Sequence, residues 1–314
     1  KHPLLMDDGG LVVNMGLGMG PITKFSPSGE ILKFNNEYVF HHSIEIDNQG
    51  KIYVPIRRNI NKAGDEINHL WTEGFAILDK NLNIIETHFL VDIYEKAGLD
   101  YHIFSNFPAN DPIHLNDVEP LRNKNNTSIV LLSIKHQSNI LAYDFVKKEV
   151  IWILRGYFKK QHDPDFLNEE GTEISIFDNN VMFNYIDRDR KVLDSNKFTI
   201  IKNLPSLINQ EKNKMVIYNK ASNHLEEARI NVIVDNFNYL KKDLIPKTQS
   251  EGLSDYLVKN NTIFIEETNF GRLLEVDYKN KKLIWQYINK NDDQLYYMMA
   301  WSRRINKIPD FKTD

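Results

Sequence analysis

The sequence predicts an all-β fold, a six-bladed β-propeller of four-stranded antiparallel blades. One hairpin pattern recurs along the chain, with a unit of roughly 40 to 50 residues. The clearest copies, SNILAYDFVKKEVIW (138–152) and GRLLEVDYKNKKLIW (271–285), begin 133 residues apart. The copies share Leu141/Leu274, Asp144/Asp277, Lys148/Lys281, Ile151/Ile284 and Trp152/Trp285. This offset equals three units of about 44 residues, so the chain holds about six.

Each expected hairpin consists of an alternating apolar run, a polar turn often led by Asp or Ser, and a second alternating run. Hairpins of this kind are predicted at 20–34, 42–55, 74–89, 113–133 and 254–266, and a weaker one near 197–218. Helical periodicity is scarce, and single helical turns are expected only at 89–97, 207–212 and 292–299. We therefore predict one domain over residues 1–314, with 296–308 closing the ring. A β-sandwich and a β-solenoid are the alternative all-β folds.

The composition excludes several classes of protein. The formal net charge of −4 argues against a nucleic-acid partner, which usually requires a basic patch. There are no cysteines, so disulfides and thiolate chemistry are excluded. No stretch approaches about 18 uninterrupted apolar residues, so no membrane-spanning helix is expected. The chain begins at Lys1, and we expect a preceding segment to be missing.

Three histidine-led motifs precede strand-like runs: His41-His42-Ser43, His114-Leu115-Asn116-Asp117 and Gln161-His162-Asp163-Pro164. Equivalent edges of successive propeller blades meet near one axis, so His42, His114 and His162 are expected to share a pocket. Imidazole titrates near neutral pH and can donate, accept or attack. The histidines outside this register are interpreted as surface or packing residues: His2, His69, His88, His102, His136 and His224. Of these, only His102 and His224 are kept as further candidates for a functional role.

Other chemistries fit the residues less well. A three-histidine zinc site is chemically reasonable, but no close H-x-H spacing accompanies it, and no metal is expected. A Ser-His-Asp hydrolase lacks the G-x-S-x-G turn. The run Gly16–Gly20 lacks the lysine of a phosphate-binding loop and is expected to be a tight crossing between strands.

Several stretches in order resemble the bacterial arylsulfotransferases: FHHSIEID (40–47), DPIHLNDVEP (111–120), KKEVIWILRG (147–156), KQHDPDF (160–166), GTEISIFDNN (171–180) and GRLLEVDYKNKKLIW (271–285). The resemblance spans nearly the whole chain, and Trp301-Ser302-Arg303-Arg304 resembles the closing segment of such propellers. It implies a six-bladed propeller in which a histidine accepts a sulfuryl group from a phenolic sulfate ester and passes it to a phenol. Transfer of this kind needs cations around the sulfuryl oxygens and splits one reaction into two steps.

The resemblance implies a role for each matching residue. The expected catalytic residues are His114, His162, Lys197 and His224. The expected substrate ligands are His42, Asn116, Asn179 and Arg188. Lys197 stands where the family has an arginine, and His224 is the candidate for the sulfuryl acceptor expected in a later blade. The resemblance also implies no cofactor, a small phenolic or aryl sulfate ligand, and a periplasmic or otherwise exported location. The alternative is a non-catalytic propeller, a binding or scaffold module that lost the acceptor histidine; a metal-dependent lyase or hydrolase is a third possibility.

Overall fold

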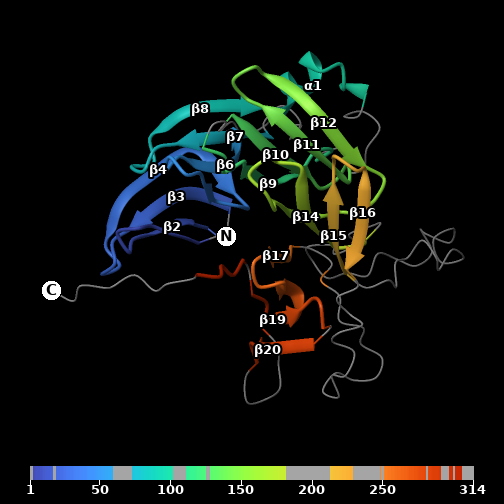
Figure 1. Ribbon diagram of the computed structural model, residues 1–314. Helices are drawn as coiled ribbons and strands as arrows, with labels where there is room; N and C mark the ends of the chain where they lie inside the picture. Colours follow the sequence, from blue (N-terminus) through green and yellow to red (C-terminus); the bar gives the residue numbers. More distant parts are fainter. Residues whose placement is uncertain are drawn as a thin grey trace, which may run out of the picture.

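The structure is a computed structural model that describes residues 3–16, 19–58, 73–101, 111–124, 128–181, 213–228, 248, 251–280, 282–290, 297–299 and 301–305. Over these residues the regular secondary structure is β-strand, apart from one α-helix and one short 3-10 helix (Figure 1). The prediction of an all-β fold built from antiparallel four-stranded units is confirmed.

The first two units form one continuous sheet. Its strands are β1 (Leu4–Leu5), β2 (Leu11–Asn14), β3 (Met19–Phe25), β4 (Ile31–His41), β5 (Glu45–Ile46), β6 (Ile52–Arg58), β7 (Glu73–Leu78) and β8 (Ile84–Phe89). Strand β4 pairs with β3 along its length, and its end, Tyr38 to Phe40, also pairs with Ile56 to Arg58 of β6. This pairing joins two units that the sequence pattern treats as separate blades.

Three further sheets have four antiparallel strands each. The second contains β9 (Leu115–Pro120), β10 (Ile129–Ile134), β11 (Asn139–Asp144) and β12 (Glu149–Arg155). The third contains β13 (His162–Phe166), β14 (Glu173–Asp178), β15 (Lys214–Asn219) and β16 (His224–Ala228). The fourth contains β17 (Leu253–Leu257), β18 (Thr262–Glu267), β19 (Arg272–Asp277) and β20 (Lys282–Ile288).

Asp-led turns hold the hairpins as the sequence pattern predicts. The Asp47 carboxylate accepts hydrogen bonds from the backbone N–H groups of Gln49 (2.8 Å) and Lys51 (2.9 Å). Asp79, Asp144 and Asp277 bond to turn residues in the same way. A side-chain acceptor two to four residues before the donor imitates a backbone turn, which explains why Asp leads so many of these hairpins.

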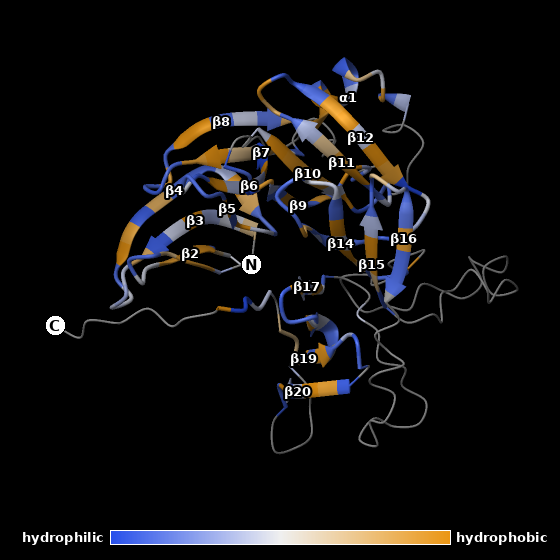
Figure 2. Cartoon of the chain, in the orientation of Figure 1, coloured by the Kyte–Doolittle hydropathy of each residue, from blue (hydrophilic) through white to orange (hydrophobic). Residues whose placement is uncertain are grey.

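The core lies between consecutive sheets. Strands β7, β10 and β11 are buried on both faces, whereas the outer strand β20 is largely exposed and β12 partly so. In Figure 2 hydrophobic residues follow β10, whereas the outer strand β16 is mostly hydrophilic. Helix α1 (Leu90–Lys96) packs Leu90, Ile93 and Tyr94 into the core between the first two sheets, where the pattern predicted a helical turn. The 3-10 helix Thr268–Phe270 connects β18 to β19.

The first strands of the units lie near one another. Strand β9 contacts β5, β6 and β13, and β13 contacts β17. The segment 301–305 follows the fourth sheet and returns to the first: the Arg303 guanidinium donates to the carbonyl of Ile44 (2.8 Å) and to Glu45 (2.7 Å). Residues just before β5, β9, β13 and β17 are therefore brought into one region. The predicted turn at 207–212 and the segment 197–212 lie outside the described residues. Of the turn predicted at 292–299, residues 292–296 lie outside them as well, and 297–299 are not helical.

Candidate functional site

A residue in the left-handed backbone conformation stands just before the first strand of the second and third units, β5 and β9. His42 (φ 54°) and His114 (φ 55°) share this conformation, which is uncommon for a residue with a side chain. In the third motif the corresponding residue is Asp163 (φ 54°), and His162 stands one position earlier, at the start of β13. His42 and His114 thus occupy equivalent backbone positions, whereas His162 does not.

Four imidazoles form a continuous row at these strand ends. The ring centroids of His41 and His42 are 5.0 Å apart, those of His42 and His114 5.1 Å, and those of His114 and His136 4.4 Å. His162 lies close enough for its charge to act on both His42 and His114, and its ring centroid is 6.3 Å from that of Trp301. His136, interpreted from the sequence as a surface or packing residue, is a member of this histidine row.

Exposure divides these five histidines into a buried floor and an accessible pair. His41 and His162 are fully buried, and His42 is 5% exposed. The side chains of His114 (15%) and His136 (12%) reach solvent. A ligand arriving from solvent therefore meets His114 and His136 first.

The tautomer of His114 is set by Asp111. The Nδ1 atom of His114 is 2.6 Å from Oδ2 of Asp111, and a carboxylate only accepts, so Nδ1 carries the proton and donates it. His136 also donates from Nδ1 to Asp111, to its backbone carbonyl, at 2.5 Å. Both rings therefore hold their Nε2 lone pairs unprotonated, the state that a nucleophile or a general base requires.

The tautomer of His162 follows from Asn179. The Asn179 amide nitrogen donates to the carbonyls of Thr248 (3.1 Å) and Glu251 (2.7 Å), so its Oδ1 accepts from Nδ1 of His162 at 2.6 Å. The Nε2 atom of His162 is buried and has no hydrogen-bond partner. Asn116 likewise donates to the carbonyl of Gln161 at 2.8 Å. These two asparagines, expected as substrate ligands, hold the strands that carry the histidines.

The histidines are neutral at pH 7. Burial lowers the pKa of His162 to about 3 and that of His136 to about 4, and it lowers the pKa values of His41, His42 and His114 well below the ordinary range. The Lys135 ammonium adds to the effect at His42, His114, His136 and His162. The neutral rings of His114 and His136, which bond through Nδ1 and reach solvent, are available as bases and nucleophiles across the physiological range.

Cations surround the histidine row. Lys135, directly after β10, is 5% exposed. Lys160 donates from Nζ to the His136 carbonyl at 2.8 Å, and burial together with Lys135 lowers its pKa to about 8. Arg57 forms an ion pair with Glu73 and lies 3.5 Å from Asp111. Sequence reasoning missed Lys135, Lys160 and Asp111, because they flank the repeated strands rather than occupy the histidine motifs.

One group of residues has the geometry of a metal site. Ligand atoms of Asp111, His114 and His136 all lie within 4.8 Å of one another, and two histidines with a carboxylate are a common ligand set for divalent iron or zinc. However, Arg57, Lys135 and Lys160 place positive charge around these atoms. This surrounding positive charge favours binding of an anion over binding of a metal cation.

The remaining predicted residues fall outside this group. His224 is exposed at the start of β16, the outermost strand of its sheet, opposite Asn219. Strand β16 is three strands away from β13, or about 14 Å at the usual strand spacing. The expectation that His224 reaches the site is therefore wrong for this structure, because sequence order did not reveal that it begins an outer strand. His102, Arg188 and Lys197 lie outside the described residues.

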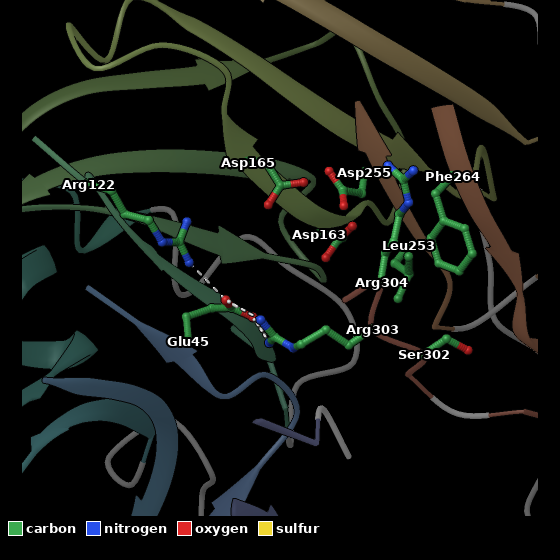
Figure 3. Close-up of a pocket in the computed structure, with 10 residues that line it drawn as sticks. All are labelled: Glu45, Arg122, Asp163, Asp165, Leu253, Asp255, Phe264, Ser302, Arg303 and Arg304. Carbon is green, nitrogen blue, oxygen red and sulfur yellow. Dashed lines mark hydrogen bonds and ion pairs between the residues drawn. The ribbon is translucent and has the colours of Figure 1, made fainter. Parts of the chain in front are cut away.

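A cavity of about 180 Å³ lies further along the same first strands (Figure 3). Arginines and carboxylates dominate its lining: Glu45, Arg122, Asp163, Asp165, Leu253, Asp255, Phe264, Ser302, Arg303 and Arg304. Glu45 pairs with both Arg122 (3.0 Å) and Arg303 (2.7 Å). This charged cavity neighbours His162 in the sequence: Asp163, which directly follows His162, and Asp165 both line it.

The fold and site together define an all-β protein of repeated four-stranded sheets with a histidine-rich, cation-flanked site at the ends of its first strands. The chain belongs to the arylsulfotransferase family: the family described as "Arylsulfotransferase (ASST)" matches residues 2–290. This confirms the resemblance inferred from the motifs.

Other comparisons add little. No curated protein matches the chain. One similar solved chain, from "Crystal Structure of Mitotic Checkpoint Complex", has a TM-score of 0.46 and 8% sequence identity, and the match covers 91% of this chain and 63% of that chain. This chain thus spans less than two thirds of the length of that relative. In the part of the chain that the structure describes, no helix is both long and apolar enough to cross a membrane.

Proposed function

We propose that the protein transfers a sulfuryl group from a phenolic sulfate ester to a phenol, with His114 as the sulfuryl acceptor. The observation that carries this proposal is the Asp111–His114 hydrogen bond of 2.6 Å on a ring that is 15% exposed. It combines an unprotonated Nε2 atom with access from solvent. His162 has an equally well-defined tautomer, but its Nε2 is buried, so an incoming ester meets His114 first.

The first step forms an N–S bond and breaks the ester S–O bond. The Nε2 lone pair of His114 attacks sulfur, and the S–O electron pair leaves with the phenolate. Phenol has a pKa of about 10, so its oxyanion is a moderate leaving group. Lys135 and Lys160 stabilise the sulfuryl oxygens and the departing phenolate, since fixed cations aimed at developing charge lower the barrier. His114 enters this step as a neutral ring and gives up no proton.

The second step returns the histidine to its starting state. The acceptor phenol oxygen attacks sulfur while Nε2 of His136 takes the phenolic proton, and the N–S electrons return to His114. His136 then releases the proton to solvent, and the first phenolate, already released, takes its proton from water. The ring centroids of His114 and His136 are 4.4 Å apart, which places the base next to the reacting nitrogen. This division into two steps is a ping-pong mechanism.

Other residues have supporting roles in this proposal. His162 and His42 form the buried floor of the site. Asn179 bonds to the His162 ring, and Asn116 bonds to the carbonyl of the preceding residue, Gln161. Lys197 and Arg188 are further proposed ligands of the sulfuryl oxygens. We also propose that the units complete a six-bladed propeller over residues 1–314, closed by 296–308; the contacts of Arg303 with Ile44 and Glu45 support closure. We also propose a periplasmic or otherwise exported location, as the family resemblance implies. No cofactor is invoked.

A non-catalytic binding module is the second candidate. The exposed position of His224 favours it, because no later unit in the described residues contributes a histidine to the row. The two candidates are separated by turnover of 4-nitrophenyl sulfate with a phenol acceptor. The proposal predicts release of 4-nitrophenol that His114→Ala abolishes and His224→Ala leaves within twofold of the wild type. Absence of turnover in the wild-type protein, with binding of the ester retained, would establish the binding module instead.

A further inference from the structure

The turn between β10 and β11, residues 135–138, carries two groups of the proposed reaction, Lys135 and His136. Its backbone is bonded to the motif that contains the sulfuryl acceptor. The Lys135 N–H donates to the carbonyl of His114 at 3.1 Å. The His136 N–H donates to the carbonyl of Ile113 at 3.2 Å. The turn therefore fixes the base and one cation relative to His114.

The turn closes with a serine in the left-handed conformation. The Ser138 N–H donates to the carbonyl of Lys135 at 3.1 Å, and its φ is 50°. In the repeat that aligns 138–152 with 271–285, the counterpart of this serine is Gly271, which has a φ of 58°. Glycine adopts this conformation without a steric cost, whereas a residue with a side chain does not. The serine side chain thus stands where the backbone favours glycine.

The Ser138 hydroxyl holds Lys160. Its Oγ atom accepts from the backbone N–H of Lys160 at 3.1 Å, and the Lys160 ammonium donates to the carbonyl of His136 at 2.8 Å. Lys160 is itself left-handed, with a φ of 59°. Two residues in a conformation that costs energy are therefore joined by one hydrogen bond. This lysine is fixed to the turn through both its backbone and its side chain.

Neighbouring bonds hold the rest of the loop between β12 and β13 without the serine. The Lys159 N–H donates to the carboxylate of Asp178 at 2.7 Å. The fully buried Gln161 donates from Nε2 to the carbonyl of Asn139 at 2.8 Å. Because the residues on both sides of Lys160 are fixed independently, loss of the serine hydroxyl should affect the placement of Lys160 and little else.

We propose that Ser138 is a positioning residue of the transfer reaction, which holds the Lys160 ammonium beside His136. This role rests on the proposed function, in which Lys160 stabilises the sulfuryl oxygens and the departing phenolate. Lys135 and Asp111 are the charges that act on the Lys160 ammonium, so it lies beside the accessible pair of histidines. A cation that is fixed before the reaction stabilises developing charge more effectively, since it does not have to be reoriented during the step.

NMR titration of Lys160 in the whole chain tests its placement without any substrate. Burial and Lys135 lower the pKa of Lys160 to about 8, and loss of the Ser138 hydroxyl should let the ammonium move toward solvent. In Ser138→Gly we therefore expect the titration midpoint of Lys160 to rise by about one pH unit or more. The free energy of unfolding should change little, because glycine fits the left-handed conformation but adds freedom to the unfolded chain. The resonance is assigned by its loss in Lys160→Arg.

Kinetics test the role in the reaction. With 4-nitrophenyl sulfate and a phenol acceptor, Ser138→Gly should lower kcat/KM at pH 7 by about 2- to 10-fold, the usual effect of losing one neutral hydrogen bond. The fall of kcat/KM at alkaline pH should move up together with the titration of Lys160. Ser26→Gly is the matched control, because the Ser26 hydroxyl accepts from the backbone N–H of Glu30 at 3.0 Å in an exposed hairpin turn. Both readouts should match the wild type in this control.

Two outcomes would overturn the proposal. One is an unchanged Lys160 midpoint in Ser138→Gly, and the other is a raised midpoint with wild-type kcat/KM and pH profile. A serine with a merely structural role would lower the free energy of unfolding on substitution and leave the midpoint and the alkaline fall in place. Absence of turnover in the wild-type protein is a different failure: it removes the transfer reaction, whereas the titration reports on the hold of Ser138 on Lys160 in either case.

Discussion

Replacing Asp111 by asparagine tests how the site activates His114. The Asp111 carboxylate accepts from Nδ1 of His114 at 2.6 Å, and its side chain is 17% exposed, so the bond is largely shielded from water. A hydrogen bond to a charged group contributes about 1.5–3 kcal/mol. Asparagine retains the size of the side chain and loses the charge.

The expected loss in kcat/KM follows from that energy. At 1.36 kcal/mol for each factor of ten, it corresponds to about 10- to 150-fold. The loss rises toward about 10⁴-fold if the amide nitrogen of asparagine turns to Nδ1 and stabilises the opposite tautomer. The fold should persist, because Arg57 remains paired with Glu73.

Two measurements check this prediction. Turnover of 4-nitrophenyl sulfate gives kcat/KM, with Asp79→Asn as the control. Nitrogen-15 NMR of the His114 ring reports the tautomer directly: Nδ1–H in the wild type and a mixture or the reverse in Asp111→Asn. A wild-type ring protonated on Nε2, or an Asp111→Asn variant within twofold of the wild-type kcat/KM, would refute the reasoning.

Three further predictions concern charge. Lys135→Met should raise KM for the ester and lower kcat, because the variant lacks a cation beside the sulfuryl oxygens; unchanged steady-state constants would contradict that role. The pH profile of kcat/KM should remain flat through pH 6.5. It should fall below about pH 4 as His136 becomes protonated, and above about pH 8 as Lys160 loses its proton. A fall in kcat/KM centred near pH 6.5 would instead show that the histidines have ordinary pKa values. Burial raises the pKa of Asp165 above its unfolded value, so the native state binds more protons and loses stability as pH rises. Asp165→Asn should therefore raise the free energy of unfolding at pH 8, by about 1.4 kcal/mol for each unit of that shift that lies below pH 8. It should have little effect at pH 4, and urea titrations at the two pH values measure the difference.

The strands could be predicted from the sequence because their signals are local. Alternating apolar residues and an Asp that caps its own turn, as Asp47 and Asp144 do, need no tertiary information. The joining of β4 to β6 could not be predicted in this way. It depends on where the end of a long strand lies against the next unit, and alternation within β4 does not encode this.

The candidate site was predictable in part. The repeat brought His42, His114 and His162 together, since equivalent strand ends must meet. Asp111 and Lys135 were missed because they flank strands, where no periodic pattern identifies a residue as facing inward. His224 was assigned to the site from family order alone, and its position on an outer strand decided against it.

Rapid quenching of the protein with 4-nitrophenyl sulfate in the absence of an acceptor, followed by peptide mass mapping, tests the central claim most directly. The proposed mechanism predicts one added sulfuryl group on the peptide that contains His114, and its disappearance when a phenol is added before the quench. Modification of another residue, or no modification while 4-nitrophenol is released in steady state, would contradict it.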